Sequence, residues 1–386
     1  MEDVYLVSAV RSAVARGKQG GGLAAVHPVE LSAQVMRAAI ERAGVESAMI
    51  DDIFWGCAMP EASQGLNVAR LASLRAGIPV DVPSATVNRF CSSGLQTIAF
   101  GAQSIMSGTA DVVLAGGVEM MSQVPMSGYH TRLDPEITES YIGMGFTAER
   151  VADRWKVSRE DQDRWALRSQ QNASRAIADG TFDAQIVPIA VEDVRWKGTK
   201  KEATARTFVR DELPRPETTA EGLAKLRPAF KAKGTVTAGN ASPYSDGAAA
   251  VLLMSESRMK ATGAKPVARF VGFAAAGVDP DIMGVGPIKA VPKALKKAGL
   301  SLADIDLIEF NEAFAAQVCA VMKDLGMDES KVNVNGGAIA LGHPLGATGA
   351  KLTTQLIHEL TKRGGGRGLV TMCVGGGMGA AGIFEV

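Results

Sequence analysis

Short, nearly continuous apolar stretches alternate along the chain with longer stretches in which apolar residues recur at helical spacing. The short stretches at 110–115, 248–254 and 368–372 are rich in Val, Leu, Ala and Met. Strands that are apolar at almost every position are typical of a sheet covered by helices on both faces. The 43 glycines gather where these stretches end, as they do at junctions between strands and helices. The pattern predicts a layered α/β fold.

The order of these stretches repeats once along the chain. In each copy a strand leads through a helix to a second strand, and then through a turn and a helix to a strand that ends in glycines. Matching positions lie roughly 250 residues apart. The paired stretches are 5–10 with 267–272, 50–56 with 305–311, 87–88 with 334–335, and 116–117 with 375–377. We therefore expect a duplicated fold with two similar halves, each containing a βαβαβ unit.

The residues between the two copies differ in character and are expected to form an inserted loop domain. A charged helix is predicted from a cap at Ser158, with Asp161 three residues later, to Gly180. Residues 195–233 hold eleven Lys and Arg against five Asp and Glu, which suits either a solvated surface or a cradle for a polyphosphorylated ligand. The expected domains are an N-terminal half (1–119 with 243–264), the loop domain (120–242, CoA-binding by the resemblance given below) and a C-terminal half (265–386).

Composition narrows the classes of function. Among 386 residues, 41 basic and 41 acidic side chains cancel, so no overall charge attracts nucleic acid or an anionic membrane. No apolar stretch of the sequence is long enough to span a bilayer, and residues 1–7 do not resemble a signal peptide, so we expect a cytoplasmic protein. Four cysteines are too few for a disulfide framework and lack metal-ligand spacing, so no metal is expected.

Cys91 falls where an extended stretch turns into a helix, because apolar residues recur at helical spacing from Leu95 to Ile105. At a helix N-terminus the dipole and the free N–H groups favour a thiolate, so Cys91 is a candidate nucleophile with a lowered pKa. A buried packing residue is the alternative. Cys57 and Cys319 have no such context and are interpreted as packing residues.

Four further residues stand in settings that suit chemistry. His343 lies in a stretch, 335–349, where glycines and a proline make a rigid loop, which suits a general base or hydrogen-bond donor. Cys373 follows a strand and precedes a glycine-rich turn whose bare N–H groups can stabilise an oxyanion. Asn311 and Glu312 follow another strand and fit the same mouth of the sheet, with a helix cap at Asn311 as the alternative.

Four stretches together resemble the active-site motifs of the thiolase family. They are NRFCSSG at 88–94, NEAF at 311–314, GHP at 342–344 and CVGGG at 373–377. They stand in the family's order and at about its spacing, and the likeness extends over essentially the whole chain. The resemblance implies the thiolase fold and an acyltransferase that attacks acyl-CoA thioesters with a cysteine.

The resemblance also implies a role for each residue. Cys91 would become acylated, His343 would be the base that activates it, and Cys373 would move a proton at the α-carbon of the substrate. Asn311 would hold a water that forms one oxyanion hole with His343, and the backbone N–H groups of Cys91 and Gly375 would form the other. CoA would be a co-substrate, and no further cofactor is implied.

Binding residues for CoA are implied in the same way. Arg215 matches a basic residue that contacts the CoA nucleotide in related enzymes, with a solvent-facing arginine as the alternative. The stretches 226–230 and 238–242 match segments that line the adenine and the pantetheine. With the loop-domain stretch around Gly143, they provide the remaining expected contacts, Leu226, Phe230, Ala238, Ser242 and Met144.

One departure from the family pattern bears on the substrate. Thiolases that form acetoacetyl-CoA often carry a histidine just before a Met-Gly in the loop domain, where this chain has Gly143. Because glycine removes bulk and a polar group, we expect an open acyl pocket and a degradative 3-ketoacyl-CoA thiolase, as in fatty-acid β-oxidation, that accepts longer chains.

Other readings and the expected assembly complete the sequence-based predictions. A biosynthetic acetoacetyl-CoA thiolase is the rival within the family, and a non-catalytic thiolase-like lipid-binding protein is the remote one. The latter would lack a reactive residue, and a ketoacyl synthase of the same fold would lack Cys373. By analogy with the family we expect a homodimer or homotetramer.

Overall fold

The computed structural model describes residues 2–126, 128–129 and 132–386. Within these ranges eleven strands form one sheet, and two more form a separate hairpin. The strands of the sheet are β1 (Val4–Ser12), β2 (Ala15–Arg16), β3 (Asp52–Gly56), β4 (Ser84–Val87), β5 (Val112–Met120), β6 (Ile186–Val187), β9 (Ser245–Ser255), β10 (Ala268–Gly277), β11 (Leu307–Phe310), β12 (Arg367–Val374) and β13 (Met378–Glu385). Their order is β11-β12-β13-β10-β1-β9-β5-β3-β4, with β2 paired to β9 and β6 to β1.

The sheet consists of two halves with the same topology. In the first half β1, β9 and β5 pair antiparallel, and β3 and β4 then follow in parallel. In the second half β10, β13 and β12 pair antiparallel, and β11 follows in parallel. The counterpart of β4 is reduced to a parallel bridge between Ile308 and Val332. The halves join where β1 pairs with β10, which confirms the predicted duplication.

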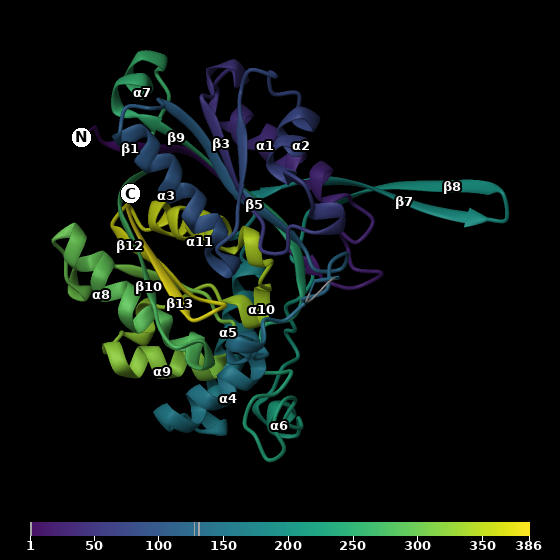
Figure 1. Cartoon of the computed structure of the whole chain (residues 1–386), viewed down its shortest axis with the longest axis vertical. Helices are drawn as coiled ribbons and strands as arrows, with labels where there is room; N and C mark the ends of the chain where they lie inside the picture. The colour runs from purple at the N-terminus through teal and green to yellow at the C-terminus, as the bar shows by residue number, and fades with distance from the viewer. Residues whose placement is uncertain (1, 127, 130–131) are drawn as a thin grey trace.

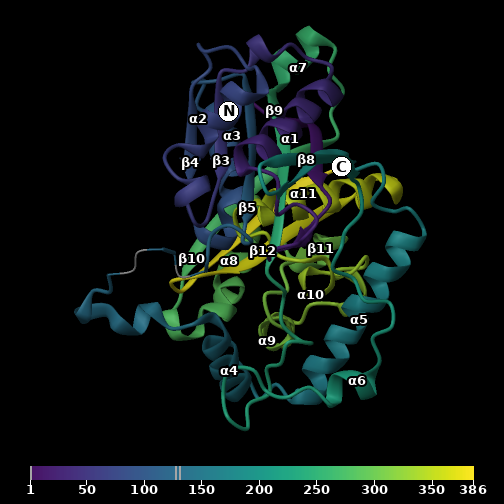
Figure 2. The same ribbon diagram turned by 90° about the vertical axis from the view of Figure 1, so that its right-hand side faces the viewer.

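Helices cover both faces of each half in layers (Figures 1 and 2). The outer layers contain α1 (Pro28–Ala43) and α2 (Val68–Ala76) on the first half, and α8 (Gly286–Ala298) and α9 (Ala315–Leu325) on the second. The middle layer contains α3 (Ser93–Met106) and α11 (Leu345–Lys362), whose apolar residues share one core with strands of both halves. Both β5 and β9 are buried at every position, as their apolar pattern predicts.

Glycines allow the two middle helices and the sheet to approach closely. A Cβ on Gly349 of α11 would lie 2.1 Å from the backbone nitrogen of Leu95 in α3. A Cβ on Gly117 would lie 2.1 Å from the carbonyl oxygen of Gly346. The prediction that Gly116 and Gly117 end a strand is therefore wrong. They lie inside β5, because the start of α11 packs against the backbone there.

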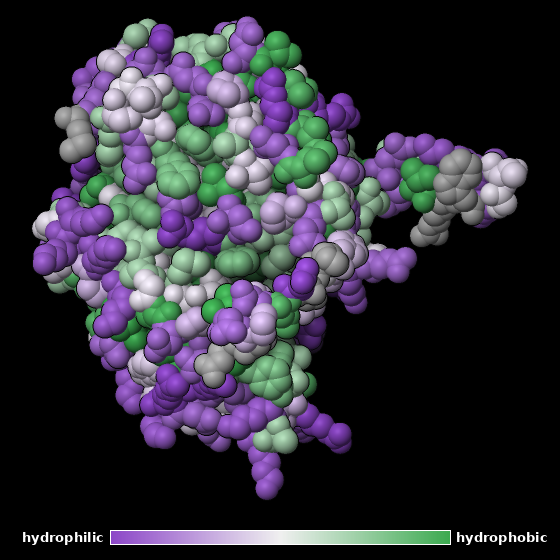
Figure 3. All heavy atoms as spheres, in the orientation of Figure 1, coloured by the Kyte–Doolittle hydropathy of each residue, from purple (hydrophilic) through white to green (hydrophobic). Residues whose placement is uncertain are grey.

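The segment between the halves contributes α4 (Met144–Trp155), α5 (Arg159–Ala178), α6 (Ala220–Ala224) and the hairpin of β7 (Ile189–Lys197) and β8 (Lys200–Phe208). The capping box of Ser158 and Asp161 at the start of α5 is confirmed. Apolar residues of α4 and α5 join the core of the second half, whereas the hairpin stands away from the body (Figures 1 and 3). The division of the chain into three domains stays a prediction.

Two short helices lie outside this segment, α7 (Glu256–Thr262) and α10 (Ala338–Leu341).

Candidate active site

Cys91 lies on a sharp turn that links β4 to α3. The turn is a short 3₁₀ segment, Phe90–Ser92, and Phe90 has a φ of +43°, which a bulky residue rarely adopts. Asn88 holds the turn, because its Oδ1 accepts the N–H of Phe90 at 2.8 Å and its Nδ2 donates to the carbonyl of Ala58 at 3.1 Å. Backbone strain of this kind concentrates at functional sites. The predicted position of Cys91 at the start of a helix is confirmed.

The prediction that the helix terminus lowers the pKa of Cys91 is wrong. Burial raises the pKa of this thiol to about 12, although the backbone N–H groups of Gly375 and of Cys91 itself act in the opposite direction. The buried carboxylate of Glu119 adds to the increase. A thiol in this environment carries its proton at neutral pH, so a nucleophilic role requires a base.

Cys373 and Gly375 lie close to the turn that carries Cys91. Cys373 is the penultimate residue of β12 and is fully buried. Burial, and then the charge of Cys91, raise the pKa of the Cys373 thiol well above its ordinary value. A Cβ on Gly375 would lie 3.6 Å from the ring of Phe90. The two thiols and the N–H of Gly375 therefore share one place at the carboxyl end of β12.

A chain of hydrogen bonds joins Asn311, His343 and Thr348. Asn311 Nδ2 lies 3.2 Å from His343 Nε2, and His343 Nδ1 lies 2.6 Å from Thr348 Oγ1. Thr348 Oγ1 donates its single proton to the carbonyl of Pro344 at 3.0 Å, so it accepts from Nδ1–H. The imidazole is thus held with its proton on Nδ1 and its lone pair on Nε2.

The buried imidazole of His343 is neutral. Burial, and then the charge of Lys351, lower the pKa of His343 to about 3. A neutral imidazole in this tautomer is a competent proton acceptor at Nε2, whose lone pair accepts the Asn311 Nδ2–H. Asn311 Oδ1 is buried and has no hydrogen-bond partner among the described residues.

Glu312 turns away from this site. Its carboxylate accepts from Trp165 Nε1 at 3.0 Å, Ser169 Oγ at 2.6 Å and Asn333 Nδ2 at 2.8 Å, so it ties α5 to the second half. The prediction that Glu312 shares the mouth of the sheet with Asn311 is wrong, because these donors draw it into the core. The alternative of a helix cap at Asn311 is also wrong, since the N-cap of α9 is Phe314.

Two of the predicted CoA-binding residues lie beside the NEAF stretch. Ser242 N donates to the carbonyl of Ala313 at 3.0 Å. The ring of Phe230 packs edge-on against Phe314 at 6.1 Å between centroids, and against Phe146 at 6.4 Å.

The other predicted CoA-binding residues lie further out on the loop segment. Arg215 and Ala238 are exposed. Leu226 is partly exposed, and its side chain packs against the backbone of Gly239. Met144 is the first residue of α4. Their role as CoA contacts stays a prediction.

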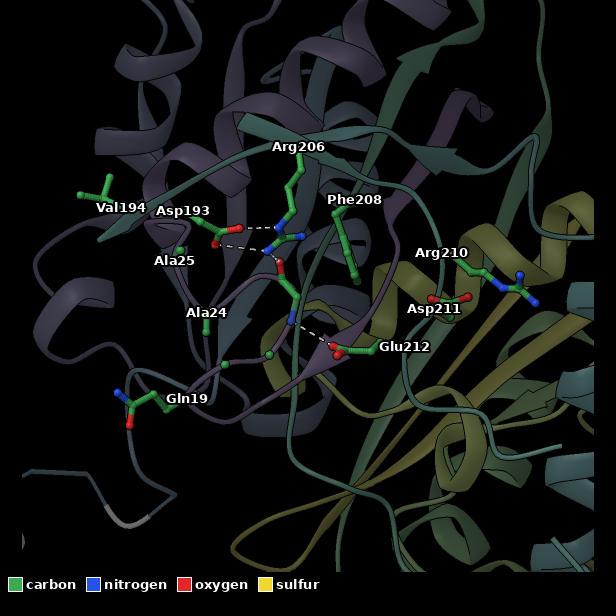
Figure 4. Close-up of a pocket in the computed structure, with 13 residues that line it drawn as sticks. Gln19, Ala24, Ala25, Asp193, Val194, Arg206, Phe208, Arg210, Asp211 and Glu212 are labelled. Atoms are coloured by element: carbon green, nitrogen blue, oxygen red, sulfur yellow. Dashed lines mark hydrogen bonds and ion pairs between the residues drawn. The ribbon is translucent and has the colours of Figure 1, made fainter. Parts of the chain in front are cut away.

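A hollow of about 890 Å³ lies elsewhere, at the base of the hairpin. Figure 4 shows Arg206 pointing toward Asp193, with which it pairs, and Glu212 accepting the N–H of Gly22. None of Cys91, Asn311, His343 or Cys373 lines it. Its paired charges and lack of a nucleophile indicate a structural joint between hairpin and body.

Sequence reasoning missed Thr348 and Glu119. Thr348 sits in the predicted loop of His343, and a hydroxyl five residues after a histidine gives no signal of its own. Glu119 accepts the N–H groups of Ala58 and Gly346, both at 2.8 Å, and so joins the segment after β3, to which Asn88 is bonded, to the start of α11. Its partners are distant in sequence, so only the fold reveals the link.

These features define a duplicated α/β fold with two thiols, of which Cys373 is buried and Cys91 partly exposed, and with an imidazole and an amide at one end of its sheet. Models of the thiolase N-terminal and C-terminal domains match residues 4–257 and 264–386. The 3-ketoacyl-CoA thiolase of Bacillus subtilis is 53% identical over 392 residues, covering 100% of both chains. The acetyl-CoA acetyltransferase of Pseudomonas aeruginosa is 46% identical over 397 residues, covering 99% of this chain and 98% of the relative.

Solved structures agree with the sequence comparisons. The acetyl-CoA acetyltransferase of Bacillus anthracis superposes with a TM-score of 0.90 at 45% identity, covering 100% of this chain and 99% of that one. Human mitochondrial 3-ketoacyl-CoA thiolase superposes with a TM-score of 0.89 at 42% identity, covering 100% and 98%. The chain belongs to the thiolase family.

Proposed function

We propose that this thiolase cleaves 3-ketoacyl-CoA with CoA to acetyl-CoA and a shortened acyl-CoA, through an acyl-cysteine intermediate. As a member of the thiolase family the chain is an acyltransferase that acts on acyl-CoA and CoA. The hydrogen-bond chain Asn311–His343–Thr348 carries the proposal, because it presents a neutral base in a defined tautomer, with its lone pair on Nε2.

In the first step His343 Nε2 takes the proton of Cys91. The sulfur then bonds to the C3 carbonyl carbon of the substrate, and the C2–C3 bond breaks to release the enolate of acetyl-CoA. The raised pKa of Cys91 supports the need for this base. The N–H groups of Cys91 and Gly375 face the thiol and suit one oxyanion hole, and Asn311 Oδ1 suits the water of the other.

Cys373 supplies the proton that the departing enolate needs at its α-carbon. Its fully buried thiol keeps that proton at neutral pH, because burial raises its pKa. In the second half-reaction the thiolate of Cys373 takes the proton of the incoming CoA thiol, whose sulfur takes the acyl group from Cys91. The imidazolium of His343 then returns its proton to the sulfur of Cys91.

The loop segment is the proposed site of CoA. Phe230 and Ser242 adjoin the NEAF stretch, which suits the pantetheine arm. Arg215, Leu226, Ala238 and Met144 extend from there toward the surface, where basic residues suit the phosphates of CoA.

Two observations bear on the acyl chain. Gly143 caps the start of α4, and a Cβ there would meet only the ring of Phe146, at 3.4 Å. The position therefore leaves space for an acyl chain, which supports a degradative enzyme with longer substrates. The names of the relatives point both ways, since they include 3-ketoacyl-CoA thiolases and acetyl-CoA acetyltransferases, so the biosynthetic role stays the alternative.

A homodimer or homotetramer in the cytoplasm is proposed with this activity. The edge strand β4 and the exposed apolar side chains of Leu66 and Val80 support self-association.

In the described ranges no helix is long and apolar enough to cross a membrane. No group of three or more potential metal ligands occurs among the described residues.

The test is CoA-dependent cleavage across a series of 3-ketoacyl-CoA substrates, with Cys91→Ala beside the wild type. We expect comparable rates on four-carbon and eight-carbon substrates, and loss of cleavage and of the acyl-enzyme in the variant. A strict preference for four carbons would transfer the proposal to the biosynthetic role. If folded wild-type protein cleaved no substrate, the lipid-binding alternative would replace it.

A further inference from the structure

A buried lysine and a buried glutamate lie behind His343 and take no part in the steps above. Lys351 of α11 is 2% exposed and Glu309 of β11 is 1% exposed. Lys351 Nζ donates to the carbonyl of Gly342 at 3.4 Å, a long hydrogen bond, and Glu309 Oε2 has no partner among the described residues. Burying charges with so few hydrogen bonds costs free energy, so such groups are candidates for a function.

The position of Lys351 makes its charge more costly still. Side chains of a helix lean toward its N-terminus, and Lys351 accordingly reaches back past the first turn of α11 to Gly342, the neighbour of His343. Its ammonium thus lies at the positive end of an 18-residue helix. An apolar side chain of the same length would fill this space without either penalty, so packing does not explain a lysine here.

Glu309 faces the same end of α11. Side chains alternate along a strand, and Leu307 packs in the core that contains α11, whereas Ile308 and Phe310 pack in the core that contains α9. Glu309 and Asn311 therefore share the face of β11 toward α11. The strand makes two parallel links to that helix end, one from Asn311 to the imidazole and one by charge between Glu309 and Lys351.

We propose that Lys351, with Glu309 as its titrating neighbour, is a positioning residue for His343 whose charge governs how readily the imidazole accepts the proton of Cys91. The inference rests on the proposed function, in which His343 is that base. Among the causes that shift the two groups, the charge of Lys351 acts on His343 and is not among those that act on Cys91. The pair would thus adjust the base without acting on the nucleophile.

The direction of the effect with pH follows from the charges around the pair. Burial lowers the pKa of Lys351 to about 8 and raises the pKa of Glu309 to about 8. Below pH 8 a cation stands behind His343 and opposes the imidazolium, and as pH rises through about 8 that cation is lost and the imidazole becomes the better base. The other charged groups that act on Lys351 are Arg11 on β1, Asp211, which forms a bidentate pair with Arg11, and Glu312. The pair of Arg11 and Asp211 is internally balanced.

The test follows alkylation of Cys91 by iodoacetamide between pH 6 and pH 10, measured on the Cys91 peptide by mass spectrometry, with no substrate present. Lys351→Met removes the charge and keeps the length of the side chain. We expect it to alkylate faster than the wild type at pH 6.5, by about threefold or more, and to converge with the wild type above pH 9. Lys351→Arg keeps the charge and should follow the wild-type rates below pH 8.

The control is Thr354→Val, which removes a buried hydroxyl from the same helix without changing charge. A purely structural role of Lys351 would loosen the site and raise the alkylation rate by the same factor at every pH. That result, or rates equal to the wild type throughout, would overturn the inference. If Lys351→Met does not fold, Glu309→Gln replaces it. The rise in the Cys91 alkylation rate that accompanies the loss of the Lys351 charge near pH 8 should then occur at lower pH. A rise at the same pH as in the wild type would also overturn the inference.

His343→Gln separates this inference from the proposed function. If His343 is the base, its loss should change the alkylation of Cys91, and Lys351→Met should add nothing in that background. If His343→Gln leaves the alkylation of Cys91 unchanged at every pH, the proposed base fails and the pair fails with it. If His343→Gln alters alkylation but Lys351→Met does not, only the inference about the pair fails.

Discussion

Gly117→Ala tests whether the close contact between β5 and α11 positions the site. The added Cβ would lie 2.1 Å from the carbonyl oxygen of Gly346, and a separation of at least 3.0 Å requires a shift of about 0.9 Å (3.0 − 2.1). Both contacts are backbone, so no side chain can turn away. The start of α11, with Gly346 N bonded to Glu119 and His343 three residues earlier, must move instead.

The expected magnitude follows from that shift. Overpacking a tight interior costs about 1–3 kcal/mol of folding free energy. A displacement of about 1 Å in a reacting group costs on the order of 100-fold in rate. We therefore expect a lower melting temperature and a kcat for thiolysis reduced by about two orders of magnitude.

The matched control is Gly272→Ala, another glycine inside a strand. Its added Cβ would meet only the Cβ of Ala298, at 4.0 Å, so stability should stay within about 0.5 kcal/mol and kcat should not change. The assay is thermal unfolding with steady-state thiolysis, with kcat normalised to the fraction of Cys91 that can be acylated. Wild-type kcat in Gly117→Ala would refute the reasoning that this contact positions His343.

Three further predictions concern the site and its support. Thr348→Val removes the acceptor of His343 Nδ1–H, so kcat should fall by about tenfold or more with KM for CoA little changed. The control is Thr353→Val, which removes a buried hydroxyl from the same helix. Equal kcat in the two variants would contradict a role of Thr348 in fixing the tautomer of His343. The pKa of His343 is lowered to about 3 in the folded chain, so the contribution of the neutral imidazole to the free energy of unfolding is complete above about pH 6.5 and is lost toward pH 3. The melting temperature of His343→Gln should therefore fall less than that of the wild type between pH 7.5 and pH 5. Equal falls in melting temperature would exclude the effect. Glu312→Ala leaves Trp165 Nε1 and Asn333 Nδ2 without their acceptor and should destabilise the fold by about 3 kcal/mol. The measurement is chemical unfolding against Glu329→Ala, whose partners are the exposed Arg164 and the partly buried Arg168.

Much of the secondary structure could be predicted from the local pattern of apolar and polar residues. The strands β1, β5, β9 and β12 follow from apolar runs, and the capped start of α5 follows from Ser158 and Asp161. The duplication is also visible in the sequence, because both halves repeat the same order of elements. These features depend on neighbours within a few residues, which is why a single sequence reveals them.

The site divides in the same way. The family and the candidates Cys91, His343, Cys373 and Asn311 follow from local sequence, since each candidate stands where a strand or glycine-rich loop ends. Local sequence did not determine their electrostatics. The thiol pKa of Cys91 rises rather than falls because the fold buries it, and a helix dipole cannot offset that desolvation.

The hydrogen-bond and charge partners of the site residues become visible only in the tertiary structure. Thr348 fixes the tautomer of His343, Glu312 leaves the mouth of the sheet for donors on α5, and Lys351 stands behind the imidazole. The donors of Glu312 on α5, Trp165 and Ser169, lie 147 and 143 residues away in the chain. Local sequence determines where a side chain leaves the backbone, whereas burial and hydrogen-bond partners depend on segments that meet only after the two halves have packed around α3 and α11.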